Sequence, residues 1–154
     1  MKQVFAVVLL SCFAAACGDS SPTAPTASTS MTGTWAGCAS DSSSSMGTGS
    51  LMGQAGMGTM TWPLTQSGST VTGSVSFAGM QGRTPGAFSG MMSGDEMTFT
   101  MDMPINSMVS SGCTARATGT ARVDGTRTTM TGTYGGSNSC TGAFTNGQMT
   151  MTRR

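Results

Sequence analysis

The sequence predicts an all-β protein, an antiparallel up-and-down meander of about eight strands that closes into a small barrel. Three observations predict this class. Apolar residues alternate with Thr or Ser over many short segments, a glycine-centred pentad recurs, and tight turn signals alternate with long connections. Alternating side chains give a strand one apolar face for a core and one polar face for water, as in antiparallel sheets.

The alternation is clearest in M-T-F-T-M-D-M at 97–103. Its odd-numbered residues are apolar and its even-numbered residues are polar, so the apolar set shares one face of a strand. The same phase holds at 59–64 and 71–77. The apolar faces predicted for these three strands are Met97, Phe99, Met101 and Met103; Met60, Trp62 and Leu64; and Val71, Gly73, Val75 and Phe77.

The recurring pentad places a glycine on the apolar face between two larger residues. It reads M-T-G-T-W at 31–35, V-T-G-S-V at 71–75, A-T-G-T-A at 117–121 and M-T-G-T-Y at 130–134. Small barrels alternate small and large inward residues to fill a narrow interior. A strand glycine also permits bending and the close approach of a neighbour, so the pentad favours a tightly curved sheet.

Eight strands are expected at 31–37, 57–66, 70–78, 86–92, 96–103, 113–123, 127–135 and 147–153. The short connections at 67–68, 93–95 and 124–125 carry hairpin signals, whereas 38–56, 79–85, 104–112 and 136–146 are long. In a meander, odd and even connections lie at opposite ends, so we expect one end of short turns and one of long loops. Asn146-Gly147 leaves an alternative open, because this hairpin signal could split the last region into two strands.

The N-terminus is expected to be removed. Residues 1–16 combine Lys2 with an apolar stretch at 4–16, which is typical of a secretory signal. The run A-A-A-C-G ending this segment resembles the lipobox of bacterial lipoproteins. The resemblance implies that Cys17 is lipidated and becomes the first mature residue. A plain secretory signal, or cleavage at L-L-S-C in 9–12, is the alternative.

The lipoprotein resemblance also implies a cellular location. Acyl chains on Cys17 would attach the protein to a bacterial envelope membrane. Gly18 after the cysteine favours the outer membrane, with the protein facing the periplasm or the cell surface. Residues 17–30 are then the lipidated cysteine and a flexible Ser/Thr/Pro tether, and residues 31–154 form a single barrel domain.

Two short motifs resemble lipocalin-like (calycin) barrels. Gly33-Thr34-Trp35 matches the G-x-W of their first strand, and Arg153 stands where their last strand carries an arginine that packs over this tryptophan. T-G-T-W is also similar to the opening of avidin-type barrels. Only Trp35 and Trp62 are present, so the avidin set of ligand-facing tryptophans is missing and no biotin-binding residues are transferred.

The composition argues against catalysis and nucleic-acid binding. The chain has no histidine, six acidic residues and a formal net charge of +1. Without histidine the usual general base is missing, and a catalytic zinc site is not expected. Glu96 and Asp102 lie on one strand face at a spacing of about 20 Å, too far for a glycosidase pair. The dispersed arginines form no basic patch. We expect neither an enzyme nor a cofactor.

The cysteines and methionines carry the remaining signals. Cys38, Cys113 and Cys140 remain in the mature domain, and an oxidising envelope favours one disulfide. Cys113–Cys140 is the preferred pairing and Cys38–Cys140 the next. Most of the 16 methionines fit the phase of the apolar faces, which indicates core packing, whereas Met46, Met52 and Met57 do not. The pairs at 91–92, 101–103 and 149–151 resemble the methionine motifs of periplasmic copper proteins and keep Cu(I) as an alternative.

The function expected from these features is a membrane-anchored binding module for a small apolar or amphipathic ligand. Its oligomeric state is not predicted. The alternative is a structural or interaction lipoprotein whose barrel is filled by its own side chains. The side chains expected to line a ligand are Met60, Trp62, Phe77, Met97, Phe99, Met101 and Met103.

Overall fold

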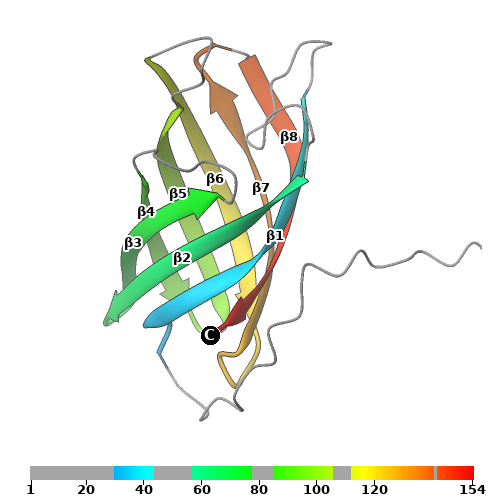
Figure 1. Cartoon of the computed structure of the whole chain (residues 1–154). Coiled ribbons are helices and arrows are strands. Elements are labelled where there is room, and N and C mark those ends of the chain that lie inside the picture. The colour runs from blue at the N-terminus through cyan, green and yellow to red at the C-terminus, as the bar shows by residue number, and fades with distance from the viewer. Residues whose placement is uncertain (1–29, 44–56, 78–84, 106–111, 141) are drawn as a thin grey trace, which may run out of the picture.

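The computed structural model describes residues 30–43, 57–77, 85–105, 112–140 and 142–154. These residues form one closed barrel in which every strand pairs antiparallel with its neighbours in sequence, and the last strand pairs with the first (Figure 1). The predicted fold class is therefore confirmed. The strands are β1 (Gly33–Ser43), β2 (Met57–Ser67), β3 (Thr70–Phe77), β4 (Gly86–Ser93), β5 (Glu96–Ile105), β6 (Cys113–Val123), β7 (Thr129–Asn138) and β8 (Gly142–Arg153).

The inward face of each strand is apolar, as the alternation predicts. In β5, Met97, Phe99, Met101 and Met103 are at most 5% exposed, whereas Asp102 between them is exposed. β6 follows the same rule, with buried alanines alternating with exposed Thr and Arg. Burial of this apolar surface is the main force that holds such a sheet closed.

Inward glycines of the strands, including Gly119 of one pentad, let neighbouring strands and large side chains come close. A Cβ atom at Gly37 would lie 1.9 Å from the carbonyl oxygen of Thr150 on β8. A Cβ at Gly119 would lie 2.6 Å from the ring of Phe99, and at Gly147 it would meet the ring of Tyr134. Each distance is shorter than any carbon contact allows, so only glycine fits. The recurring glycine is thus a requirement of the narrow barrel.

Two predicted boundaries are wrong. β1 continues to Ser43, where a short strand ending at residue 37 was expected. The expected long loop at 136–146 is a connection of residues 139–141 between β7 and β8. Asn146 has φ of 54° inside β8, close to a register shift at Tyr134–Gly136. The Asn-Gly pair therefore forms an irregularity of one continuous strand, because the positive φ that suits a hairpin turn also suits a β-bulge.

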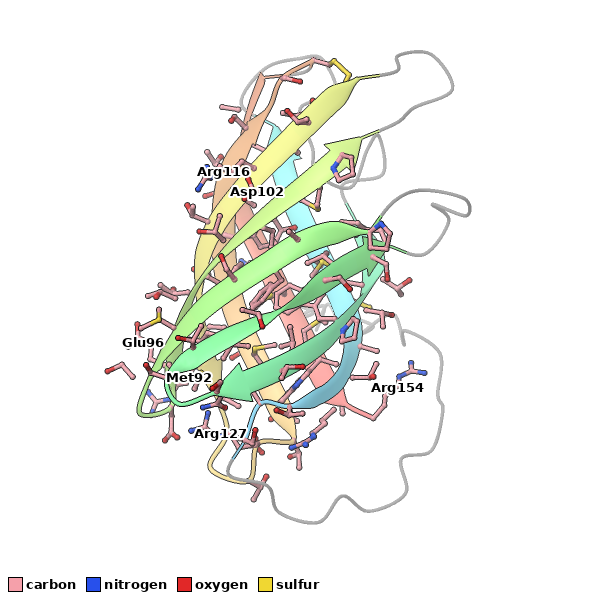
Figure 2. All side chains as sticks on the ribbon, turned by 90° about the vertical axis from the view of Figure 1, so that its left-hand side faces the viewer. Met92, Glu96, Asp102, Arg116, Arg127 and Arg154 are labelled. Carbon is pink, nitrogen blue, oxygen red and sulfur yellow. A yellow bond between two sulfur atoms is a disulfide. The ribbon has the colours of Figure 1, made fainter. Side chains whose placement is uncertain are left out.

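The two ends of the barrel differ. One end, which we name the floor, carries the turns at 68–69, 94–95 and 124–128 together with the chain entering at Ser30 and the end of β8. The opposite end, the disulfide end, carries Cys113 and Cys140 (Figure 2). Residues 1–29, including Cys17 and the expected signal and tether, lie outside the described residues.

Candidate functional site

The expected ligand-lining residues all face the interior. Six of them are at most 5% exposed, and Phe77 is half-buried and packed against the same core. They come from β2, β3 and β5, and Trp62 on β2 reaches across the barrel to Phe99 on β5, with 5.6 Å between ring centroids. The interior positions of Met60, Met97, Met101 and Met103 also place four methionine side chains in this core. Whether these residues bind a ligand remains a prediction.

An aromatic cluster occupies the centre of the interior. The ring centroids of Trp62 and Phe88 are 4.8 Å apart at a tilt of 42°, and Phe88 stacks on Phe99 at 5.7 Å. Phe88 was not among the expected lining residues. Its signal was present, because G-A-F-S-G at 86–90 alternates small or aromatic residues with Ala and Ser in the phase of a strand.

The described part of the interior is filled by protein atoms. A void large enough for a ligand would leave accessible surface on its walls, yet Trp62, Met60, Met97 and Met101 are at most 1% exposed. The space above inward glycines is also occupied, for example at Gly132 by the methyl of Met149, 2.9 Å from a Cβ position. Close packing of this kind is typical of protein cores.

Trp35 and Arg153 hold the segment from Ser30 to Thr32 at the floor of the barrel by hydrogen bonds. Trp35 is fully buried, and its Nε1 donates a hydrogen bond of 2.9 Å to the carbonyl of Met31. Arg153 lies opposite Trp35 in the β1–β8 register and donates to the carbonyls of Ser30 and Thr32. Its guanidinium lies against Gly33, where a Cβ would be 2.9 Å from Nε. The G-x-W motif and Arg153 therefore meet, and Arg153 donates hydrogen bonds to backbone carbonyls there.

Polar groups face inward near the disulfide end. The hydroxyl of Tyr134 donates to the Ser40 carbonyl and to Oδ2 of Asp41, each at 3.2 Å. Burial, and then the Asp41 charge, raise the pKa of Tyr134 above its usual value. Asn138 is 6% exposed, and its side-chain oxygen accepts a 2.9 Å hydrogen bond from the Cys140 amide.

The disulfide joins Cys113 on β6 to Cys140, which follows β7, with 5.7 Å between their Cα atoms. This confirms the preferred pairing over Cys38–Cys140. Cys38 lies on β1 opposite Thr150 of β8 and is half-buried. The bridge closes a sequence separation of 27 residues beside Asn138.

A groove runs over the outer surface of β6, β7 and β8. It consists of a hollow of about 790 Å³ and a second of about 490 Å³ that share Thr120, Thr133 and Gln148. We name it the outer groove. Registered side chains form its base, since Thr120 pairs with Thr133 and Thr133 with Gln148. Glu96 and Arg122 lie at the end that contains the larger hollow. From the sequence, these threonines were predicted only to face solvent.

The charged side chains form surface pairs. Arg116 and Asp102 lie side by side on β6 and β5, with 3.6 Å between Nε and Oδ1, and both are more than half exposed (Figure 2). Nη2 of Arg127, whose side chain is 13% exposed, lies 3.6 Å from Oδ1 of Asp95. An exposed pair such as Arg116–Asp102 contributes little stability. Within the described residues, no group of three or more His, Cys, Asp or Glu side chains is arranged to hold a metal ion.

Two of the methionine pairs suggested for copper lie in the core, with Met101 and Met103 inward on β5 and Met149 and Met151 inward on β8. In the third pair, Met91 on β4 is exposed and Met92 is partly buried. Copper binding remains a prediction.

Comparison of the chain with protein-family models, with curated proteins and with solved structures finds no match. The part of the chain that the structure describes contains no helix with the length and apolar character needed to cross a membrane.

Proposed function

We propose that this protein is a non-catalytic, lipid-anchored lipoprotein of the bacterial envelope that recognises a partner through the outside of a filled barrel. The observation that carries the proposal is the packed interior. Trp62, Met97 and Met101 already fill part of the interior with at most 1% of their surface exposed. A ligand inside the barrel would have to displace these side chains, whereas a partner on the outside would find a preformed surface.

The outer groove is the recognition surface that fits this role best. Its side chains are mostly neutral hydroxyl and amide groups, and the backbone below them is fixed by continuous strand pairing from β6 to β8. A rigid display of side chains reduces the entropy lost on binding. Its charged side chains, Asp95, Glu96 and Arg122, line the larger hollow only, so over the rest of the groove hydrogen bonding and shape are the basis of recognition.

The floor gives the proposed anchor a direction. Ser30 is the first described residue, and Arg153 holds its carbonyl at 3.0 Å at the floor. A chain running from a lipidated Cys17 would therefore reach the barrel at the floor. Its 13 residues span at most about 45 Å. The floor would face the membrane, and the disulfide end would point away from it.

Site-specific photocrosslinking in cells tests the recognition surface. A photoreactive residue at Thr133, in the outer groove, should give one discrete adduct, and the same residue at Thr72, exposed on β3, should give none. Equal adducts at both positions, or no adduct at Thr133, would contradict the proposal.

Fatty-acid labelling tests the anchor independently. Cys17→Ser should abolish incorporation of a labelled fatty acid and release the protein from membranes, whereas Cys12→Ser should retain both. Labelling that survives Cys17→Ser would show that the lipobox interpretation is wrong.

A further inference from the structure

One polar atom in the interior has no partner. Trp62 is fully buried, and its Nε1 is the one buried side-chain nitrogen or oxygen among the described residues without a hydrogen-bond acceptor. Such an unsatisfied donor costs about 1–3 kcal/mol. Trp35 offers a direct contrast, because it is equally buried but donates to the Met31 carbonyl at 2.9 Å. Packing alone does not explain a tryptophan at position 62, because an apolar side chain there would leave no donor unpaired.

The surroundings of Trp62 are apolar. Phe88 and Phe99 lie beside its ring at centroid distances of 4.8 and 5.6 Å, and Met60 and Leu64 are its inward neighbours on β2. The inward polar groups described above belong elsewhere: Arg153 is bonded to carbonyls at the floor, and Tyr134 is bonded near the disulfide end. A molecule that reached Trp62 would therefore meet one donor and no charge, which favours a neutral ligand.

Methionine side chains can make room on either side of Phe88, whose ring contacts Trp62. Met97 lies over Gly90, with its Cγ and Sδ 3.3 Å from the position of a Cβ, and Met103 covers Gly86 in the same way. Methionine is unbranched and has three rotatable bonds, so it changes rotamer more readily than Leu or Val. Because Gly90 and Gly86 have no side chains, rotation of these methionines would open a hollow that reaches the backbone of β4, next to Phe88.

We propose that the interior opens beside Trp62 to bind a small, neutral, mainly apolar molecule with one hydrogen-bond acceptor, such as a ketone or an ester. The Nε1 of Trp62 donates to that acceptor, and the displaced methionines line the ligand. This goes beyond the proposed function, which uses the outer groove, because it requires the packed interior to open when such a ligand displaces the methionines.

A matched pair of probes tests the inference. Residues 20–154, purified with the disulfide intact, are titrated with 2-heptanone and with heptane while the indole N–H signals of Trp62 and Trp35 are followed by NMR. We expect 2-heptanone to bind about 3–10-fold more tightly than heptane, the gain typical of one hydrogen bond. The Trp62 signal should move downfield, and the Trp35 signal, already bonded to Met31, should stay in place.

Two variants distinguish the contribution of the Trp62 N–H donor from that of the space opened by the methionines. Trp62→Phe should remove the preference for the ketone, so that both probes bind alike. Met97→Leu keeps the core volume and Trp62 but restricts side-chain rotation, so it should weaken both probes by a similar factor. Equal affinity of wild-type protein for the two probes, no binding of either, or a ketone preference that persists in Trp62→Phe would each overturn the inference. The photocrosslinking result at Thr133 is unaffected by any of these outcomes.

Discussion

The floor and the disulfide end are held together by different means. At the floor, hairpin turns are short, and side chains of Trp35, Arg153 and Asp124 bond directly to nearby backbone groups. At the disulfide end, the described strands finish with inward polar groups and a covalent bridge. The bridge joins the start of β6 to the short connection after β7, so a covalent bond reinforces strand pairing there. At the floor, side chains that bond to the backbone of turns and chain ends have this role.

The largest effect is expected at the floor. Trp35→Ala removes a fully buried ring and the hydrogen bond to Met31, and should lower the free energy of unfolding by about 3–5 kcal/mol. Thr34→Ala, on the exposed side of the same strand, should change it by less than about 0.5 kcal/mol. Denaturant unfolding measures both. Similar small losses in the two variants would mean that the floor is not a centre of stability.

The second largest effect on stability is expected from the Cys113–Cys140 disulfide at the other end. The double variant Cys113→Ser/Cys140→Ser should lose about 2–4 kcal/mol, because the unfolded chain regains the freedom of the closed loop. Hydrogen exchange should speed up first at the disulfide ends of β6, β7 and β8, while the hairpin at 124–128 keeps its protection at low denaturant. Exchange that rises first at 124–128 would reverse the comparison between the ends.

Asp124 tests the hydrogen bonds of a floor turn. Its carboxylate accepts bonds from the Thr126 hydroxyl at 2.6 Å, from the Thr128 amide at 2.7 Å and from the Thr129 amide at 3.0 Å. These bonds, the Thr126 hydroxyl first, hold the pKa of Asp124 well below its usual range. Asp124→Ala should cost about 1 kcal/mol near neutral pH, a low value because the turn is open to solvent.

The pH dependence follows from the lowered pKa of Asp124. A carboxyl that is more acidic in the folded state stabilises the protein above its unfolded pKa of about 3.9 and loses this contribution as the pH falls towards the folded value. The stability difference between wild type and Asp124→Ala should therefore be constant above pH about 5 and shrink below pH about 4. A difference that grows on acidification would contradict this account.

Tyr134 gives the smallest expected effect. Tyr134→Phe should cost about 0.5 kcal/mol, at the low end for a hydrogen bond because both contacts of the hydroxyl are 3.2 Å long. The chain has one tyrosine, so phenolate absorbance reports this residue alone. The raised pKa means that its contribution is complete below pH about 10 and is lost at higher pH. Phenolate that forms near pH 10 in the folded protein would show that the hydroxyl is not held as described.

The sequence was informative where side-chain phase decides the structure. The inward set of β5 and the bounds of β6 follow directly from alternation. The meander put Cys38, Cys113 and Cys140 at one end and left Cys38–Cys140 open beside the pairing that forms, Cys113–Cys140. The β7–β8 connection was misjudged because a positive φ at Asn146 has the same sequence signal in a turn and in a bulge.

The interior and the outer groove lay beyond this reasoning for another reason. Alternation assigns a side chain to a face, but it does not say how far the side chain reaches across the barrel. Filling of the space over Gly119 by Phe99, and the unpaired Nε1 of Trp62, depend on contacts between strands distant in sequence. The outer groove likewise depends on the curvature that the glycines allow.

The contacts of Ser30 to Thr32 also determine how the barrel would carry mechanical load. A pull arriving through the tether reaches Arg153 on β8 through two carbonyls and Gln66 on β2 through the Met31 amide. These two residues belong to the strands on either side of β1, so tension is divided between the β1–β2 and β1–β8 pairings. Separating β1 from the barrel would require both pairings to break together. An anchored protein built in this way would resist a pulling force with many strand hydrogen bonds at once, and its strands would not separate one by one from a free edge.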